Sequence, residues 1–229
     1  MIHLKRQEMP KNWPIPRKGT TWVVRPNSNL NQGIPILIAL RDILKVAKNR
    51  REVKKMMHEK SVLLNGKIVY EEKNSVTLLD ILSIGGENYK LVLSDKGKFK
   101  FDEVKDANNK ISKIINKKVL KGKKIQLNLM GGRNLLSDIK CKTNDSVVVN
   151  FKDKKIEKCL EFKEKANAIV FGGKHIGAKG KIEKIDLKHR IVELSCGETP
   201  KGVPSSTKKK GLSEEGRINA LIKHLIIVE

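Results

Sequence analysis

A glycine-rich basic loop at residues 172–180 has the residue types of a phosphate-binding site. Gly172 and Gly177 have the spacing of the two glycines in a nucleotide-hydrolase P-loop, where a lysine and a following hydroxyl residue hold phosphate and magnesium. Here Gly177 is followed by an Ala–Lys pair, with no Ser or Thr after it. The sequence therefore argues against nucleotide hydrolysis at this loop.

The same loop contains GAKG at 177–180, which fits the GxxG signature of KH domains. In those domains the loop joins two helices and clamps a nucleotide backbone, whereas the flanking residues here have the pattern of strands. We therefore expect a strand–loop–strand element whose glycines let the backbone approach phosphate closely. Basic side chains that could assist are those of Lys174, His175 and Lys179. The alternative is a plain turn in a small barrel.

No other group of residues predicts catalysis or metal binding. The five histidines form no HxxxH pair and lie near no cluster of acids, so no metal site is expected. Cys141, Cys159 and Cys196 form no CxxC pair, which favours buried thiols in a reducing compartment. Asp80 stands alone in an apolar run, a setting more typical of a structural acceptor than of a catalytic base. We expect no enzyme activity, no cofactor and no small-molecule substrate.

Positive charge dominates the chain. Lys and Arg total 49 against 25 Asp and Glu, a formal net charge of +24. Such a surplus favours a polyanionic partner, and nucleic acid gains binding free energy as each neutralised phosphate releases counterions. Six of the nine arginines fall within residues 1–51, and arginine holds phosphate bidentately. The alternative is a solvated lysine-rich surface that reflects genomic composition.

Length and hydropathy limit the possible folds. The 229 residues suffice for one to three small domains, and with 38% hydrophobic residues the cores will be thin. No apolar run approaches the roughly 18–20 residues needed to span a bilayer. The first residues also lack the apolar stretch of a secretory signal. We expect a cytoplasmic protein with no membrane partner.

Residues 36–70 show the clearest periodicity. One helix is predicted by an apolar stripe of Leu37, Leu40, Leu44 and Ala47, with a neighbouring basic stripe of Arg41, Lys45 and Lys48. Asn49 with Glu52 three residues later is a capping box that begins a second helix. The basic face of that helix comprises Arg50, Arg51, Lys54 and Lys55. Asn65–Gly66 between two short apolar runs predicts a hairpin.

Residues 1–35 contain five of the seven prolines and both tryptophans, with no periodicity. Because closely spaced prolines disfavour helix and sheet alike, we expect an extended basic arm. Trp13 and Trp22 either anchor this arm on the protein's own surface or stack on nucleic-acid bases. Anchoring is the favoured interpretation.

From residue 71 onward the patterns mainly predict strands, with a hairpin at Asp95–Gly97 and a GGRN turn at 131–134. Residues 166–195 read as strand, basic loop, strand, turn and strand. One helix is predicted in this region by the spacing of Val104, Ala107, Ile111, Ile114 and Ile115. Residues 199–211 are expected to form a polar basic loop. Short strands at this spacing predict small barrels or sandwiches.

The helix–helix–hairpin segment, Leu40–Val69, resembles the alpha-L (S-four-like) RNA-binding fold, and 166–195 resembles a KOW motif of SH3-like barrels. Between and before them stand HLKR (3–6), WPIPRK (13–18), DILSI (80–84) and IQLNLMGGRN (125–134). In this order the segments resemble the S-four-e family, ribosomal proteins of the archaeal and eukaryotic small subunit. The resemblance runs from residue 3 to residue 195.

The resemblance implies an α+β, mainly β fold in four parts. These are a basic N-terminal arm (1–35), an alpha-L RNA-binding domain (36–84), a small central β domain (85–163) and a C-terminal KOW/SH3-like domain with its tail (164–229). It implies a structural constituent of the small ribosomal subunit, cytoplasmic and ribosome-bound. The implied partners are small-subunit ribosomal RNA and neighbouring small-subunit ribosomal proteins.

The candidate RNA-binding residues are basic side chains of the arm and helices, one arginine of the GGRN turn, and the glycine loop. They are Lys5, Arg6, Arg17, Lys18, Arg25, Arg41, Lys45, Arg50, Arg51, Lys54, Lys55, Arg133, Gly172, Gly173, Lys174, Gly177 and Lys179. Binding is expected through phosphate and groove shape with little base readout, as double-helical RNA requires.

Two other functions fit part of the sequence. An RNA-modifying enzyme of the pseudouridine synthase type could carry an appended alpha-L domain, but it would need a separate catalytic domain, and no catalytic constellation is present. A KOW transcription factor would explain the C-terminal barrel but not the alpha-L segment.

Overall fold

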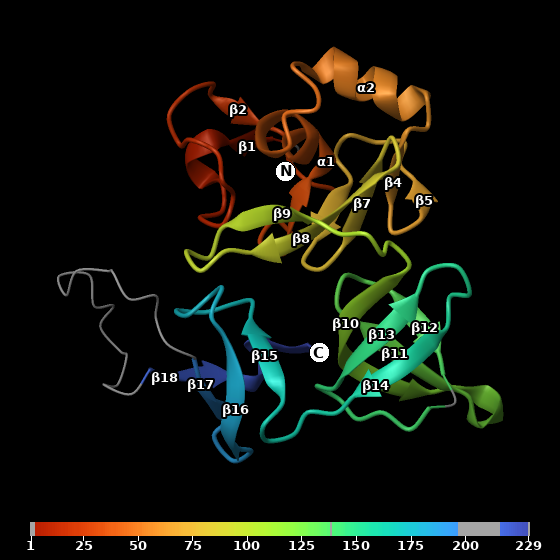
Figure 1. The fold of residues 1–229 in the computed structure, drawn as a ribbon, viewed down its shortest axis with the longest axis vertical. Helices are drawn as coiled ribbons and strands as arrows, with labels where there is room; N and C mark the ends of the chain where they lie inside the picture. The colour runs from red at the N-terminus through yellow and green to blue at the C-terminus, as the bar shows by residue number, and fades with distance from the viewer. Residues whose placement is uncertain (1–2, 138, 197–215, 229) are drawn as a thin grey trace. The chain divides into compact units, whose positions relative to one another are not determined.

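The structure, a computed structural model, describes residues 3–137, 139–196 and 216–228. Contacts group the chain into two compact units. Unit 1 comprises 1–94, 98–110 and 150–154, and unit 2 comprises 95–97, 111–149 and 155–229. Both consist mainly of antiparallel β-sheet (Figure 1), which confirms the mainly β prediction. The loop expected at 199–211 lies outside the described residues.

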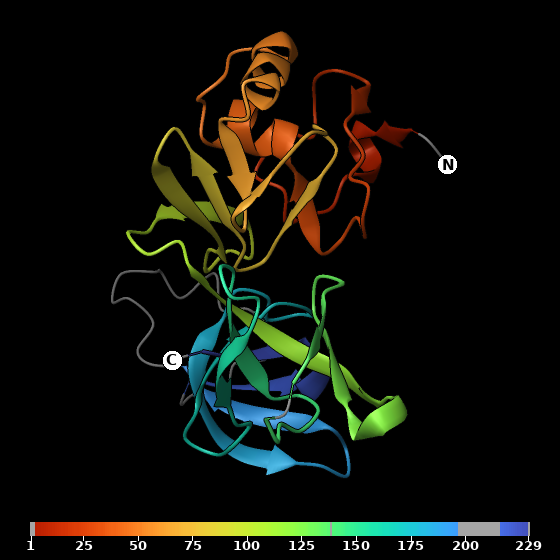
Figure 2. The ribbon, with the colours of Figure 1, turned by 90° about the vertical axis from the view of Figure 1, so that its right-hand side faces the viewer.

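Among the described residues, unit 1 holds helices α1 and α2 and three small sheets. Its two-stranded sheets pair β1 (Leu4–Lys5) with β2 (Trp22–Val23), and β3 (Gly33–Pro35) with β6 (Ser75–Thr77). Its five-stranded sheet has the order β5 (Lys67–Ile68), β4 (Val62–Leu64), β7 (Ile81–Ile84), β8 (Glu87–Leu93) and β9 (Phe99–Glu103). The helices are α1 (Ile36–Ile38), continued by a π-helical segment Ala39–Ile43, and α2 (Arg50–His58). Two views show α2 at the end of the unit away from β8 and β9 (Figures 1 and 2).

The start of α2 confirms the predicted cap. Asn49 Oδ1 accepts a hydrogen bond from the Glu52 amide at 3.0 Å, and Glu52 Oε2 accepts one from the Lys48 amide at 2.6 Å. The glutamate thus reaches back one residue further than a standard capping box requires. Val53 and Met57 form the buried face of the helix, as their spacing requires.

We expect Asn49→Ala to lower the free energy of unfolding of unit 1 by about 1 kcal/mol, because the helix loses the acceptor of one otherwise unsatisfied amide. Both tryptophans belong to unit 1, so urea unfolding followed by tryptophan fluorescence reports on it. An unchanged transition midpoint would contradict this role of the cap.

The first predicted helix is shorter than its apolar pattern indicates. Leu37 and Leu40 are buried within it, but the helix ends at Ile43. Lys45 adopts a left-handed backbone (φ 56°), and the Val46 amide donates to the Leu40 carbonyl at 3.0 Å. This is the bonding of a helix C-terminus closed by a left-handed residue. The predicted helical stripe that ends in Ala47 is therefore wrong, although Ala47 is buried.

Residues 3–35 are held on the rest of unit 1 by a buried tryptophan. Trp13 is 2% exposed, and its Nε1 donates to the Gly33 carbonyl at 3.1 Å. Trp22 is 56% exposed and lies 5.5 Å from the His3 ring. Anchoring is therefore confirmed for Trp13. The segment also forms a 3-10 turn at Arg6–Glu8 and the short strands β1 to β3, which the proline content did not predict.

Unit 2 contains two five-stranded antiparallel sheets. The first has the order β12 (Asn134–Leu136), β11 (Ile125–Leu129), β10 (Asn109–Val119), β13 (Ser146–Asn150) and β14 (Ile156–Leu160). The second has the order β18 (Arg217–Leu221), β17 (Ile191–Ser195), β16 (Lys179–Asp186), β15 (Asn167–Val170) and β19 (Leu225–Val228). Short helical turns lie at Lys121–Lys123 and Ile222–His224. Each sheet encloses its own apolar cluster.

The helix predicted from Val104 to Ile115 is wrong, because the chain forms strand β10 there. Its apolar residues coincide by chance with helical spacing, but four of the five, Val104, Ile111, Ile114 and Ile115, are β-branched and favour strands. Two lysines of this strand, Lys110 and Lys113, are also buried. Because charged residues occupy buried positions of this strand, the alternating apolar pattern that would predict a strand is missing from the sequence.

Candidate nucleic-acid interface

The solvent side of α2 is strongly basic. While Val53 and Met57 pack inward, five exposed residues form what we term the α2 basic face: Arg50, Arg51, Lys54, Lys55 and His58. Residues three and four positions apart lie on one side of a helix, so these side chains are held close together. The structure thus brings together all four residues predicted for this helix and adds His58.

Arg50 also has a structural partner. Its Nε donates to both carboxylate oxygens of Glu72, at 2.9 and 2.8 Å, and its Nη2 contacts the same carboxylate. The hydrogen bonds from Arg50 lower the pKa of the Glu72 carboxyl, and the charges of Lys54 and Lys73 lower it further. The Arg50 side chain remains 55% exposed. Arg50 therefore fixes α2 on Glu72 and still presents part of its guanidinium to solvent.

The other candidates near the helices are less well grouped. Arg41 donates to the carboxylate of its neighbour Asp42 from Nε at 3.1 Å and from Nη2 at 2.8 Å. Lys45 is exposed but lies beyond the helix end. The basic stripe predicted on the first helix is therefore not a helical stripe.

Two arginines of the arm hold the arm together. Arg6 donates to the Thr20 carbonyl at 2.7 Å, the Thr20 hydroxyl at 2.7 Å and the Pro16 carbonyl at 2.8 Å. Arg17 donates to the carbonyls of Gln7 and Met9, both at 3.0 Å. Their forked guanidiniums satisfy four backbone carbonyls of residues 7–20. Sequence reasoning assigned these two side chains to RNA and missed this role.

The remaining residues of the arm differ in accessibility. Lys5 and Lys18 are exposed, and Arg25 is half-buried. A cationic side chain that is free to move to phosphate fits the predicted role better than one held at backbone carbonyls. Lys5 and Lys18 are thus the arm residues best placed for an electrostatic contact.

The glycine loop joins β15 to β16 in unit 2. A Cβ atom at Gly172 would lie 2.9 Å from the His224 ring, and Gly173 has φ +85°. Gly177 is buried with φ +91°, and its amide donates to the Val170 carbonyl at 2.8 Å. The close approach that these glycines permit is therefore to the protein's own chain, which favours the plain-turn interpretation for them. Lys174 and Lys179 are exposed, and phosphate binding there stays a prediction.

The GGRN turn forms as predicted. Gly131 and Gly132 have φ of 89° and 80°, and the Leu129 amide donates to the Arg133 carbonyl at 2.8 Å. Arg133 is half-buried at the end of this turn. It belongs to unit 2, as does the glycine loop, whereas the arm and the α2 basic face belong to unit 1.

Sequence reasoning missed Lys73 beside α2 and Lys113 in β10. Lys113 is 4% exposed, and its Nζ donates to the Ile222 carbonyl at 2.5 Å, joining the two sheets of unit 2. Burial lowers the pKa of Lys113 from 10.5 to about 8. The Ile227 amide makes a second link by donating to Ser146 Oγ at 3.0 Å.

The depressed pKa of Lys113 predicts a pH dependence. Below pH 8 both folded and unfolded chains are protonated, so the cost of the buried charge is fully present. Between about pH 8 and 10.5 only the folded chain loses the proton, and this cost, at most about 3 kcal/mol, is progressively relieved. Relative to Lys113→Met, the wild-type melting temperature in calorimetry should rise across this interval. A constant difference between the two proteins would contradict the assignment.

Within the described ranges, no group of three or more His, Cys, Asp and Glu side chains could hold a metal ion. Cys141 is buried and Cys159 and Cys196 are half-buried free thiols. Burial, with a hydrogen bond to Cys141, raises the pKa of the Cys159 thiol to about 12. Asp80 is a buried acceptor of structural hydrogen bonds. No helix in this part of the chain is long and apolar enough to cross a membrane.

These features define a basic, β-rich protein whose charged surfaces are suited to a polyanion. Two family models match it: Ribosomal family S4e over residues 85–156, and the RS4NT (NUC023) domain over residues 2–28.

Relatives match over most of the chain. The small ribosomal subunit protein eS4 of Methanocella arvoryzae is 40% identical over 202 residues, 86% of this chain and 85% of the relative. That of Methanocaldococcus jannaschii is 33% identical and covers 96% of both. The crystal structure of the 30S ribosomal protein S4e from Thermoplasma acidophilum matches with a TM-score of 0.68 and 26% identity, covering 86% of this chain and 95% of that one.

The chain belongs to the S4e family of ribosomal proteins, which is the S-four-e family expected from its sequence. This is a structural family without enzyme activity, so the interpretation as an RNA-modifying enzyme is not supported.

Proposed function

We propose that this protein is a structural constituent of the small ribosomal subunit that binds its RNA through phosphate and shape contacts, in the cytoplasm. The α2 basic face carries the proposal, because it concentrates five exposed basic side chains on one rigid element. Its relatives bear the name of small ribosomal subunit proteins. Neighbouring small-subunit proteins would be its other partners.

The α2 basic face suits a backbone contact better than base readout. Its residues project from a short helix whose inner side is anchored by Val53, Met57 and the Arg50–Glu72 pair. Lysine and arginine on a fixed surface neutralise phosphates and release their counterions. Double-helical RNA offers phosphates and shape but hides most of its base edges in a deep groove. Contact of the face with such a helix would therefore depend little on RNA sequence.

The finer organisation belongs to the same proposal. We assign 36–84 to an alpha-L domain, supported by the succession of α1, α2 and the β4–β5 hairpin. We assign 164–229 to a KOW/SH3-like domain, supported by the strand–loop–strand order of β15 and β16 and by its separate apolar cluster. The arm (1–35) and a central β domain (85–163) complete the proposed organisation.

Mass spectrometry of salt-washed small subunits tests this function. Cells expressing the protein should yield small subunits that retain it after a low-salt wash and release it progressively as salt rises, because phosphate contacts weaken with ionic strength. Absence of the chain from low-salt small subunits would refute the proposal. Co-sedimentation with RNA polymerase instead would favour a KOW transcription factor.

A further inference from the structure

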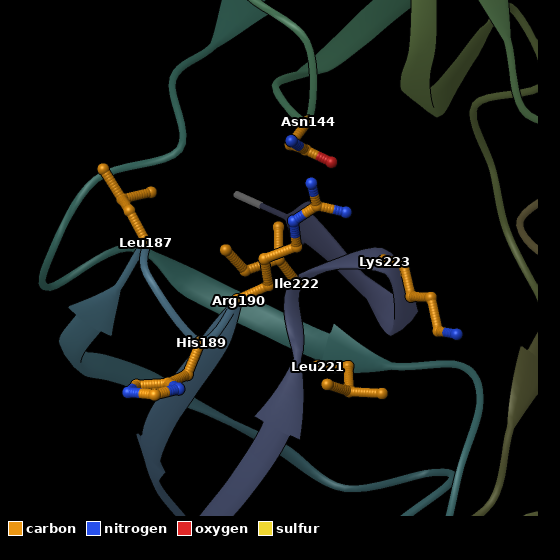
Figure 3. Close-up of a pocket in the computed structure, with 7 residues that line it drawn as sticks. All are labelled: Asn144, Leu187, His189, Arg190, Leu221, Ile222 and Lys223. Carbon is orange, nitrogen blue, oxygen red and sulfur yellow. The ribbon is translucent and has the colours of Figure 1, made fainter.

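Unit 2 has a cavity of about 470 Å³ that none of the predicted RNA-binding residues lines. Arg190, directly before β17, and Asn144, shortly before β13, both line it with left-handed backbones (φ 55° and 74°). Figure 3 shows the Arg190 guanidinium pointing toward the Asn144 amide across the cavity. A long donor and a short amide are thus brought face to face from turns that precede strands of different sheets.

Both polar groups are available to a ligand. Within the described residues, neither the Arg190 guanidinium nor the Asn144 amide has a hydrogen-bond or ion-pair partner in the protein. The guanidinium offers a planar fork of donors, and the amide offers donors and an acceptor. Together they can satisfy a ligand that carries both acceptors and donors on one flat edge.

Apolar side chains flank this polar pair. Leu187 is 74% exposed and Leu221 is 39% exposed, and both line the cavity with the buried Ile222. Exposed leucines beside unpaired donors are typical of a binding site, where apolar walls hold a ligand and a few polar groups orient it. A flat aromatic ring would cover these leucines.

The charges select the ligand class. Two lining residues, Arg190 and Lys223, are cationic, and none of the lining residues is a carboxylate. An anion is therefore favoured, and the apolar walls call for a ligand with an aromatic part. Arginine pairs bidentately with the O6 and N7 atoms of guanine, whose ring also carries an N1–H donor that an asparagine side-chain oxygen can accept. A carboxylate-bearing peptide would occupy Arg190 but has no such flat edge for Asn144.

We propose that this cavity binds one unpaired guanine nucleotide of RNA, with its O6 and N7 atoms on Arg190, its N1–H group on Asn144 and the ring against Leu187 and Leu221. The adjacent phosphate would lie at Lys223. The inference rests on the proposed RNA-binding function and extends it from backbone contacts to recognition of a base.

Fluorescence anisotropy with the full chain and labelled heptanucleotides tests this proposal. The probes are seven uridines, and the same strand with adenosine or guanosine at its centre. We expect the wild type to bind the guanosine strand about tenfold more tightly than the uridine strand, as one bidentate pair provides. Arg190→Lys keeps the charge but loses the fork, so it should abolish the preference and leave uridine binding unchanged.

Lys188→Gln is the matched control, because Lys188 lies in the same turn but outside the lining. It should weaken all three strands equally and keep the guanosine preference. A wild type without preference, or a preference that survives Arg190→Lys in a normally folded variant, overturns the proposal. A photo-reactive amino acid placed at position 187 should cross-link to RNA in small subunits, and a cross-link to a protein instead would also overturn the proposal. If ribosomal RNA binds while the guanosine preference is missing, only this inference fails and the proposed function stands.

Discussion

Replacing Asp80 with asparagine should lower the free energy of unfolding of unit 1 by about 3–5 kcal/mol, the cost of leaving a buried charge without its partner. Asp80 is 4% exposed, and its Oδ1 lies 2.5 Å from Nζ of Lys110, which is 5% exposed. Its carboxylate also accepts hydrogen bonds from Asn65 Nδ2 at 2.7 Å and from the Thr77 amide at 2.6 Å. An asparagine retains part of this acceptor set but leaves the Lys110 ammonium uncompensated.

The acid sensitivity of unit 1 should change with the same substitution. Burial alone would raise the pKa of the Asp80 carboxyl, but the charge and hydrogen bond of Lys110, with those of Thr77 and Asn65, outweigh it and lower the pKa. The stabilisation is therefore fully present above the ordinary value of about 4 and is lost as pH falls through the folded-state pKa. Asp80→Asn removes this part of the acid dependence.

Urea unfolding followed by tryptophan fluorescence measures both effects, since Trp13 and Trp22 lie in unit 1. Asp102→Asn is the matched control, because Asp102 pairs with Lys100 at 2.7 Å on the exposed surface of the same unit. Such a pair contributes at most about 1 kcal/mol. If the two variants lost the same free energy of unfolding, the buried pair would stabilise unit 1 no more than the exposed pair does.

Replacing Arg51, Lys54 and Lys55 together with glutamine should reduce the salt dependence of ribosomal RNA binding. Each lost phosphate contact makes the slope of log affinity against log salt less steep by about 0.7–0.9, so three contacts change it by about 2–3. Affinity should fall alike for structured RNAs of different sequence, because phosphates carry no sequence information. Filter binding at several salt concentrations provides the slope.

Arg50 is kept in this variant because its loss would unpair Glu72 and disturb the position of α2. The control replaces three exposed lysines of unit 1 that lie outside the α2 basic face: Lys98, Lys105 and Lys152. It removes the same charge, so a purely non-specific attraction would weaken equally in both variants. That outcome would contradict a binding role for the α2 basic face.

Local signals in the sequence predicted local structure well. The Asn49 cap and the Asn65–Gly66 hairpin depend on residues within a few positions of one another, and both form. The turn at 131–134 forms for the same reason. The family resemblance, which also rests on residue order, is confirmed by the relatives.

Features that depend on distant residues could not be predicted. The burial of Lys110 requires Asp80, thirty positions away, and that of Lys113 requires the Ile222 carbonyl. A lysine within a strand pattern is expected to face solvent. The helical spacing of the apolar residues in 104–115 therefore led to the prediction of a helix. The sequence also did not predict the roles of Arg6 and Arg17. An arginine that binds backbone carbonyls cannot be distinguished in a sequence from one that binds phosphate.

The salt dependence of binding to small-subunit ribosomal RNA tests the central claim most directly. If the full chain neutralises about eight phosphates, log affinity should fall linearly with log salt at a slope of roughly −6 to −7. A filter-binding titration of the wild-type protein measures this slope. A value in that range supports the account, and a slope near zero would contradict it.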